Sequence, residues 1–161
     1  GKRENLSVIL LHGEPTWSYL YRKMIPILIN SGLRVIAPDL IGFGKSDKPA
    51  ERKNYSYKSH INWLRQFLIK LNVHGAVLFA QDWGGLLGLR ILVEAPQTFD
   101  KVMIGNTGLP TGKEDLGEDF YSWRQYSQVS ESFKIGNIVD RGTGFMVLMV
   151  KVTSLGLMHD Q

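Results

Sequence analysis

The chain of 161 residues is long enough for one sizeable hydrophobic core, and its 43% apolar and 21% charged residues are typical of a soluble globular protein. Its net charge of +4 comes from scattered Lys and Arg without a nucleic-acid-binding motif, so no nucleic-acid partner is expected. The absence of cysteine excludes disulfides and thiolate metal sites and favours a reducing compartment, with the cytoplasm as the expected location.

Apolar runs that suit strands alternate with helical patterns along the chain. Strands are expected at 7–11 and 34–37, joined by a helix that Pro26 breaks or kinks after Met24. The next helix shows one apolar face, because four residues recur at spacings of three and four: Ile61, Leu64, Leu68 and Leu71. A third strand is expected at 76–80.

One more helix and one more strand complete the predicted sheet. The helix from Trp83 to Glu94 is apolar nearly all round, so we expect it to be buried, and Pro96 ends it. A fourth strand follows at 101–105. This alternation of strand and helix favours the α/β class, with a mostly parallel sheet and helices on both faces.

The segment Gln81-Asp82-Trp83-Gly84-Gly85 lies between the third strand and the following helix. Ala80 and Gly84, two residues either side of Asp82, match a nucleophile elbow, a tight turn that raises the reactive side chain above the sheet. An aspartate is already ionised near neutral pH and suits attack on a carbon with a good leaving group or in a strained ring. The pattern favours carbon–halogen or epoxide chemistry. The alternative is that Asp82 only caps the helix, because Asp is a preferred N-cap residue.

A second motif, His12-Gly13-Glu14-Pro15-Thr16-Trp17-Ser18-Tyr19, follows the first strand. In hydrolases with a nucleophile elbow, one oxyanion-binding N–H comes from the residue after the nucleophile and another from a loop after an earlier strand. We therefore expect backbone N–H groups of Trp83 and Glu14 in this role, with the function of the Glu14 carboxylate left open. Gly13 permits close approach of the backbone. An ordinary strand-to-helix turn is the alternative.

Together with Val35-Ile36-Ala37-Pro38-Asp39-Leu40-Ile41-Gly42-Phe43-Gly44-Lys45-Ser46-Asp47, these motifs resemble the haloalkane dehalogenases, specifically their first subgroup, from about Ser7 to Thr111. The resemblance implies a partial α/β-hydrolase core at 1–106 and an incomplete helical cap with an atypical tail at 107–161. It also implies a small hydrophobic haloalkane as substrate, a halide ion as product, and no cofactor or metal. Epoxide hydrolases share the elbow but usually place His before the Asp and an aromatic residue after the His-Gly pair, so Gln81 and Glu14 favour a dehalogenase.

The resemblance also implies a role for individual residues. Asp82 would be the nucleophile, and the indole N–H groups of Trp83 and Trp123 would hold the departing halide, since indole is a donor without a competing acceptor. For Trp123, packing against the core is an equal alternative. His12, Gly13 and Gly84 support the two motifs.

The rest of the family's catalytic triad, an acid and then a histidine, is expected after the nucleophile. His159 is the only histidine there and lies two residues from the end, and position 106 carries Asn rather than a carboxylate. We therefore expect a fragment that encodes the nucleophile without its triad partners, reacts once and stalls. An epoxide hydrolase and a catalytically incompetent fragment remain as alternatives. The apolar run at 144–158 is too short for a membrane span, which needs about 20 apolar residues, so no membrane partner is expected.

Overall fold

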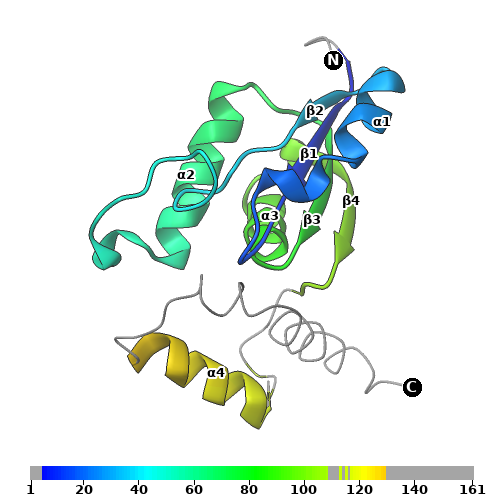
Figure 1. The fold of residues 1–161 in the computed structure, drawn as a ribbon. Coiled ribbons are helices and arrows are strands. Elements are labelled where there is room, and N and C mark those ends of the chain that lie inside the picture. Colours follow the sequence, from blue (N-terminus) through cyan, green and yellow to red (C-terminus); the bar gives the residue numbers. More distant parts are fainter. Residues whose placement is uncertain (1–4, 109–112, 114, 116, 130–161) are drawn as a thin grey trace. The chain divides into compact units, whose positions relative to one another are not determined.

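The computed structural model describes residues 5–108, 113, 115 and 117–129 (Figure 1). It divides into two compact units, Gly1–Leu109 and Pro110–Gln161. In the second unit the described residues form one helix, α4, at Glu118–Val129. The interpretation of this unit as the beginning of a helical cap stays a prediction.

The first unit is built on a parallel four-stranded sheet in the order β2-β1-β3-β4. The strands are β1 (Ser7–Leu11), β2 (Arg34–Ile36), β3 (Ala76–Gln81) and β4 (Phe99–Gly105). All four expected strands are confirmed. β2 is one residue shorter than expected, β3 is one residue longer, and β4 begins two residues earlier.

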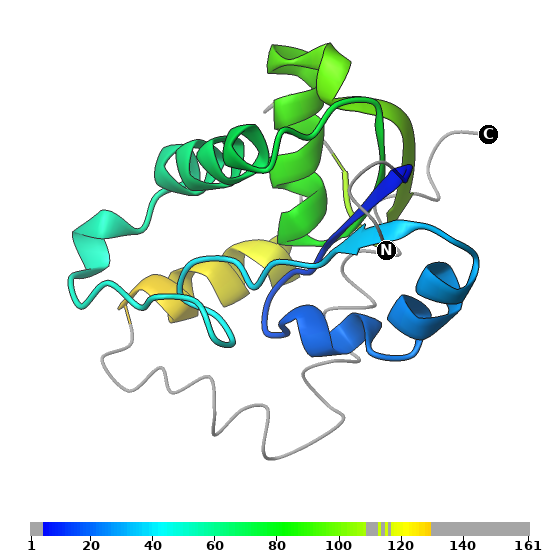
Figure 2. The same ribbon diagram turned by 90° about the horizontal axis from the view of Figure 1, so that it is seen from above.

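Helices lie on both faces of the sheet (Figures 1 and 2), as expected for the α/β class. The α-helices are α1 (Met24–Asn30), α2 (Tyr57–Lys70) and α3 (Trp83–Glu94). Short 3-10 turns occur at Ser18–Tyr21, Arg52–Asn54 and Pro96–Thr98. At the start of α2, Ser56 is the N-cap residue, and its side chain accepts the Ser59 N–H at 3.1 Å.

Two helical expectations were wrong in detail. Pro26 lies in the first turn of α1, which begins at Met24, so the helix continues beyond the proline instead of breaking after Met24. Proline is tolerated there because the backbone N–H groups of a helix's first turn have no acceptor within the helix, so the N–H that proline lacks is not missed. α3 is not buried on every side, as its apolar sequence had suggested: Leu87 and Ile91 are buried, but Val93 is 67% exposed.

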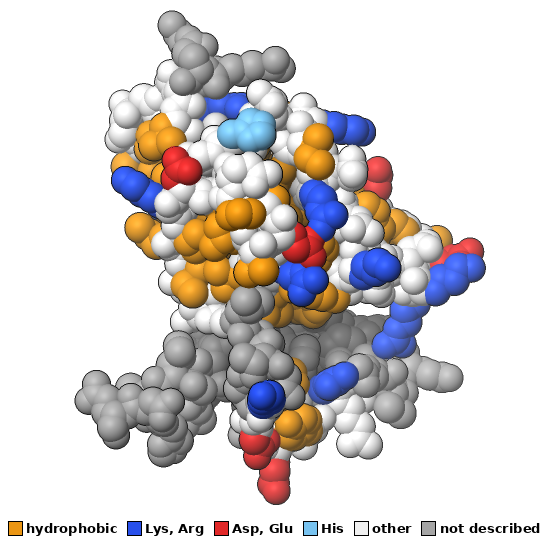
Figure 3. Space-filling model, turned by 180° about the vertical axis from the view of Figure 1, so that it is seen from behind, with side chains coloured by type: hydrophobic (Ala, Val, Ile, Leu, Met, Phe, Trp, Pro, Cys, Tyr) orange, Lys and Arg blue, Asp and Glu red, His pale blue; other side chains and the backbone are white. Residues whose placement is uncertain are grey.

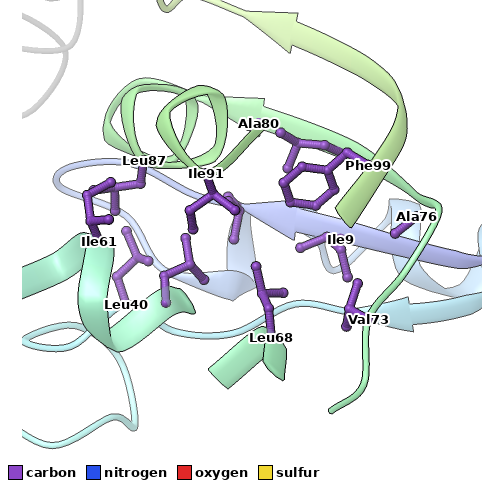
Figure 4. Close-up of a cluster of buried hydrophobic side chains, with 13 residues drawn as sticks. Ile9, Leu40, Ile61, Leu68, Val73, Ala76, Ala80, Leu87, Ile91 and Phe99 are labelled. Carbon is purple, nitrogen blue, oxygen red and sulfur yellow. The ribbon is translucent and has the colours of Figure 1, made fainter. Parts of the chain in front are cut away.

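The core consists of two apolar clusters, one on each face of the sheet. On the first face α2 and α3 pack side by side over β1 and β3 (Figure 4), with Ile9 and Leu78 fully buried between the layers. On the other face Val8, Leu10 and Tyr21 pack against α1. Neighbouring residues of β1 thus enter opposite clusters, because side chains alternate along a strand.

The order of the strands places a topological switch between β1 and β3. From β1 the chain moves outward to β2, and it then returns to β3 on the other side of β1. Ligands of open α/β sheets bind at such a point, beyond the carboxyl ends of the strands. Leu11 pairs with Ala80 at these ends, so the His12-Gly13 and Gln81-Asp82 segments leave the sheet next to each other.

β4 is an edge strand of this sheet, and most of its side chains are exposed. They include Val102, Met103 and Ile104, and hydrophobic side chains are visible on the surface of the unit in the view from behind (Figure 3). Among the described residues, no helix has both the length and the apolar character needed to cross a membrane.

Candidate active site

Asp82 occupies a strained turn between β3 and α3. Its backbone angles are φ 52° and ψ −127°, a region that non-glycine residues rarely adopt and that costs about 1–3 kcal/mol. The turn also brings α3 close to the end of β1, since a Cβ at Gly84 would lie only 2.5 Å from the His12 carbonyl oxygen. This geometry matches the expected elbow, and the Asp82 side chain does not cap α3.

The carboxylate of Asp82 faces the loop after β1. The backbone N–H of Glu14 donates to Asp82 Oδ1 at 2.7 Å. A Cβ at Gly13 would lie 2.6 Å from Asp82 Cγ, so glycine is needed for this approach. Burial raises the pKa of Asp82, while hydrogen bonds from the N–H groups of Trp83 and Glu14 oppose that rise. The Glu14 N–H predicted from the sequence therefore binds this carboxylate directly, and the Trp83 N–H lowers its pKa.

His12 is fully buried and hydrogen-bonded through both ring nitrogens. Its Nε2 accepts the N–H of Leu40 at 2.9 Å, which leaves the proton on Nδ1, and Nδ1 donates to the Gly13 carbonyl at 3.0 Å. Burial lowers the pKa of His12, which fits this neutral form. With both nitrogens engaged, His12 connects two loops and is not free to accept a proton from water.

The carboxyl group of Glu14 is a second acid near Asp82. Burial raises the pKa of Glu14, and the charge of Asp82 raises it further. The Glu14–Pro15 peptide bond, which leads out of the loop, is cis. Since two neighbouring carboxylates repel each other, ionisation of Asp82 favours the neutral form of Glu14.

Sequence reasoning missed Asp39, which follows β2. Its carboxylate accepts the N–H of Ser18 at 2.8 Å and that of Lys45 at 2.7 Å, and so connects the loop after β1 to the loop after β2. Burial alone would raise the pKa of Asp39, but these two N–H groups hold it below its ordinary value. Its position in the sequence could have identified Asp39, because it is a lone acid just beyond the carboxyl end of the strand expected at 34–37.

Sequence reasoning also missed Thr107, which follows β4. Its hydroxyl donates to the Asp82 carbonyl oxygen at 2.8 Å, and the Asp82 N–H donates to Asn106 O at 3.2 Å. A Cβ at Gly85 would lie 2.6 Å from Thr107 Cβ, so Gly85 makes room for this contact. The loop after β4 therefore supports the elbow from the side opposite Glu14.

The Trp83 ring lies near α2, with centroid distances of 6.3 Å to Tyr57 and 6.5 Å to His60. Tyr57 donates its hydroxyl to Leu86 O at 2.9 Å, which holds this side chain against α3. The side chain of Trp123 and the whole of His159 lie outside the described residues. Within the described part of the chain, no group of three or more His, Asp or Glu is placed to hold a metal ion.

Comparison with known proteins agrees with this geometry. The family model described as alpha/beta hydrolase fold matches residues 7–130. The chain belongs to the α/β-hydrolase fold family. Within this family it is 55% identical over 143 residues to a haloalkane dehalogenase of Psychrobacter cryohalolentis, a match that covers 89% of the chain and 47% of that protein. The chain spans about half the length of the curated relatives it matches.

Solved structures of the α/β-hydrolase fold family give the same result. The haloalkane dehalogenase DpaA of Paraglaciecola agarilytica NO2 superposes with a TM-score of 0.79 at 40% identity, covering 95% of the chain and 52% of DpaA. The epoxide hydrolase VrEH1 of Vigna radiata reaches a TM-score of 0.63 at 27% identity over 66% of the chain and 35% of VrEH1. The resemblance to haloalkane dehalogenases expected from the motifs is confirmed.

Proposed function

We propose that this chain carries the nucleophile half of a haloalkane dehalogenase site. The observation that supports it most is the Asp82 carboxylate on a strained elbow, with the Glu14 N–H 2.7 Å from Oδ1. The bond from Glu14 holds one carboxylate oxygen and leaves Oδ2 as the attacking atom. The high identity to haloalkane dehalogenases favours a carbon–halogen bond as its target.

In the proposed reaction Oδ2 forms a bond to the carbon that carries the halogen, and the electron pair of the carbon–halogen bond leaves with the halide ion. The product is an alkyl ester of Asp82. The indole N–H of Trp83 would receive the halide, with Trp123 as the proposed second donor. In the complete reaction the family's histidine would take a proton from water as the water attacks Asp82 Cγ, and the N–H groups of Glu14 and Trp83 would stabilise the oxyanion that develops on Oδ1. When the oxyanion collapses, the bond from Cγ to the alkyl oxygen breaks, the alcohol leaves with a proton from the histidine, and the Asp82 carboxylate is restored.

The proposal is tested by incubating the 161-residue chain with 1-bromobutane and measuring bromide release and protein mass. We expect one butyl group per chain, located on Asp82 by peptide mapping, and one bromide ion released with it. Asp82→Asn should abolish the adduct, whereas Asp100→Asn, which changes an exposed carboxylate in β4, should react like the parent chain. Equal alkylation of exposed carboxylates and Asp82 would contradict the proposal.

Two further outcomes separate the alternatives. Sustained bromide release over many turnovers would contradict the expectation that the chain stalls after one reaction. A parallel incubation with styrene oxide tests the alternative function of an epoxide hydrolase, which the similarity to VrEH1 also suggests. Faster ester formation with the epoxide than with the bromoalkane would favour an epoxide hydrolase.

A further inference from the structure

Two peptide groups act on the Asp82 carboxylate: the Glu14 N–H donates a hydrogen bond to it, and the Trp83 N–H lowers its pKa. A threonine hydroxyl donates to the carbonyl oxygen of each of these peptides. The Gly13–Glu14 peptide donates through Glu14, and its carbonyl oxygen accepts the hydroxyl and the N–H of Thr16, each at 2.9 Å. The Asp82–Trp83 peptide carries the Trp83 N–H, which lowers the Asp82 pKa, and its carbonyl oxygen accepts the Thr107 hydroxyl at 2.8 Å. The two threonines come from different loops, those after β1 and after β4.

The first of these peptides is also the end of a longer series of hydrogen bonds. The Ser46 hydroxyl donates to Asp39 O at 2.6 Å, and the next N–H along the chain, from Leu40, donates to His12 Nε2. The His12 Nδ1–H then donates to Gly13 O, in the peptide whose N–H reaches Asp82. All donors point the same way along this series. Hydrogen bonds in such a chain polarise one another and strengthen the last donor.

We propose that Thr16 and Thr107 are positioning residues, which orient and polarise the two peptide groups that hold the Asp82 carboxylate. The inference rests on the proposed function, because it takes Asp82 as the nucleophile. A peptide whose carbonyl accepts several donors keeps its plane fixed, and its N–H becomes a stronger donor. Thr16 thus acts on Oδ1 through the Glu14 N–H, and Thr107 acts on the carboxylate through the Trp83 peptide.

The test removes each hydroxyl without changing the side-chain shape, in Thr16→Val and Thr107→Val. The measurement is the pKa of Asp82 in the 161-residue chain, followed by carbon-detected NMR titration of labelled aspartate. Each valine variant should raise this pKa by about 0.1 to 0.7 of a pH unit, since cooperative strengthening is about 10–30% per bond. Thr16→Ser and Thr107→Ser should restore the parent value, because they retain the hydroxyl.

Ser31→Ala is the matched control. It also removes a hydroxyl that donates to a backbone carbonyl, that of Ile27 at 3.0 Å, but this carbonyl belongs to α1 and not to a peptide that contacts Asp82. Its Asp82 pKa should equal that of the parent chain. If the valine variants lower the melting temperature but leave the Asp82 pKa unchanged, the threonines stabilise their loops only and the inference is wrong.

Alkylation provides a second readout that separates this inference from the proposed function. If Asp82 reacts with 1-bromobutane, the pH at half-maximal rate should rise in the valine variants by the same amount as the NMR pKa, and the serine variants should reverse it. If the parent chain does not react at all, the proposed function is wrong. The NMR titration still decides whether the threonines act on the carboxylate.

Discussion

Replacing Gly13 by alanine should separate the Asp82 carboxylate from its N–H donor. The new Cβ would lie 2.6 Å from Asp82 Cγ and closer still to Oδ1. Because non-bonded carbons pack at about 3.5 Å or more, the carboxylate must retreat by about 1 Å and lose the bond from Glu14. A displacement of about 1 Å at a reacting group costs roughly 100-fold in rate, and the overpacking costs about 1–3 kcal/mol of stability.

The assay is the rate of butyl-ester formation on Asp82, measured by mass spectrometry under single-turnover conditions, with a urea melt of the same sample. Gly105→Ala is the control, because no atom lies within 4 Å of its Cβ. It should leave the rate unchanged and raise stability by at most about 0.5–1 kcal/mol, the usual gain from glycine to alanine within a strand. An unchanged alkylation rate and unchanged stability in Gly13→Ala would refute the reasoning.

Two further predictions concern stability. Burial lowers the pKa of His60 from 6.5, so this histidine should reduce stability as the pH falls below that value, whereas the raised pKa values of Glu14 and Asp82 act in the opposite direction. Urea melts of the parent chain and of His60→Gln between pH 7.5 and pH 5 isolate the histidine contribution: the variant should lose less stability on acidification, and an equal pH dependence in the two proteins would contradict this. Ile91→Val, at a position 1% exposed, should cost about 0.5–1.5 kcal/mol in the same melt, whereas Val93→Ala, at 67% exposure, should stay within about 0.5 kcal/mol. Equal losses in the two variants would show that the assumed core is not tightly packed around α3.

The sequence predicts those parts of the molecule that local patterns encode. The apolar runs locate all four strands to within two residues, and the stretch from Trp83 to Glu94 coincides with α3. The approach of Glu14 to Asp82 also follows from motifs, since both segments leave the carboxyl ends of strands. A parallel sheet brings such ends together.

The polar connections between loops were not predictable in the same way. Asp39 and Thr107 act on residues more than 20 positions away, and contacts of this kind leave no periodic signal. The exposure of Val93 was missed because a helix rich in leucine predicts burial on every side. Nor does the composition of β4 reveal that it lies at an edge, which depends on strand order.

The pairing of β1 with β3 has a consequence for how the chain folds. Glu14 and Asp82 are separated by 68 residues, and their hydrogen bond joins the ends of neighbouring strands. During synthesis β1 therefore has no partner on this side until β3 has emerged, and closing so long a loop slows the search for native contacts. The Asp82 carboxylate thus reaches its hydrogen-bonded position only through a late, long-range event, and the rate of the proposed alkylation of Asp82 would report when the sheet has folded.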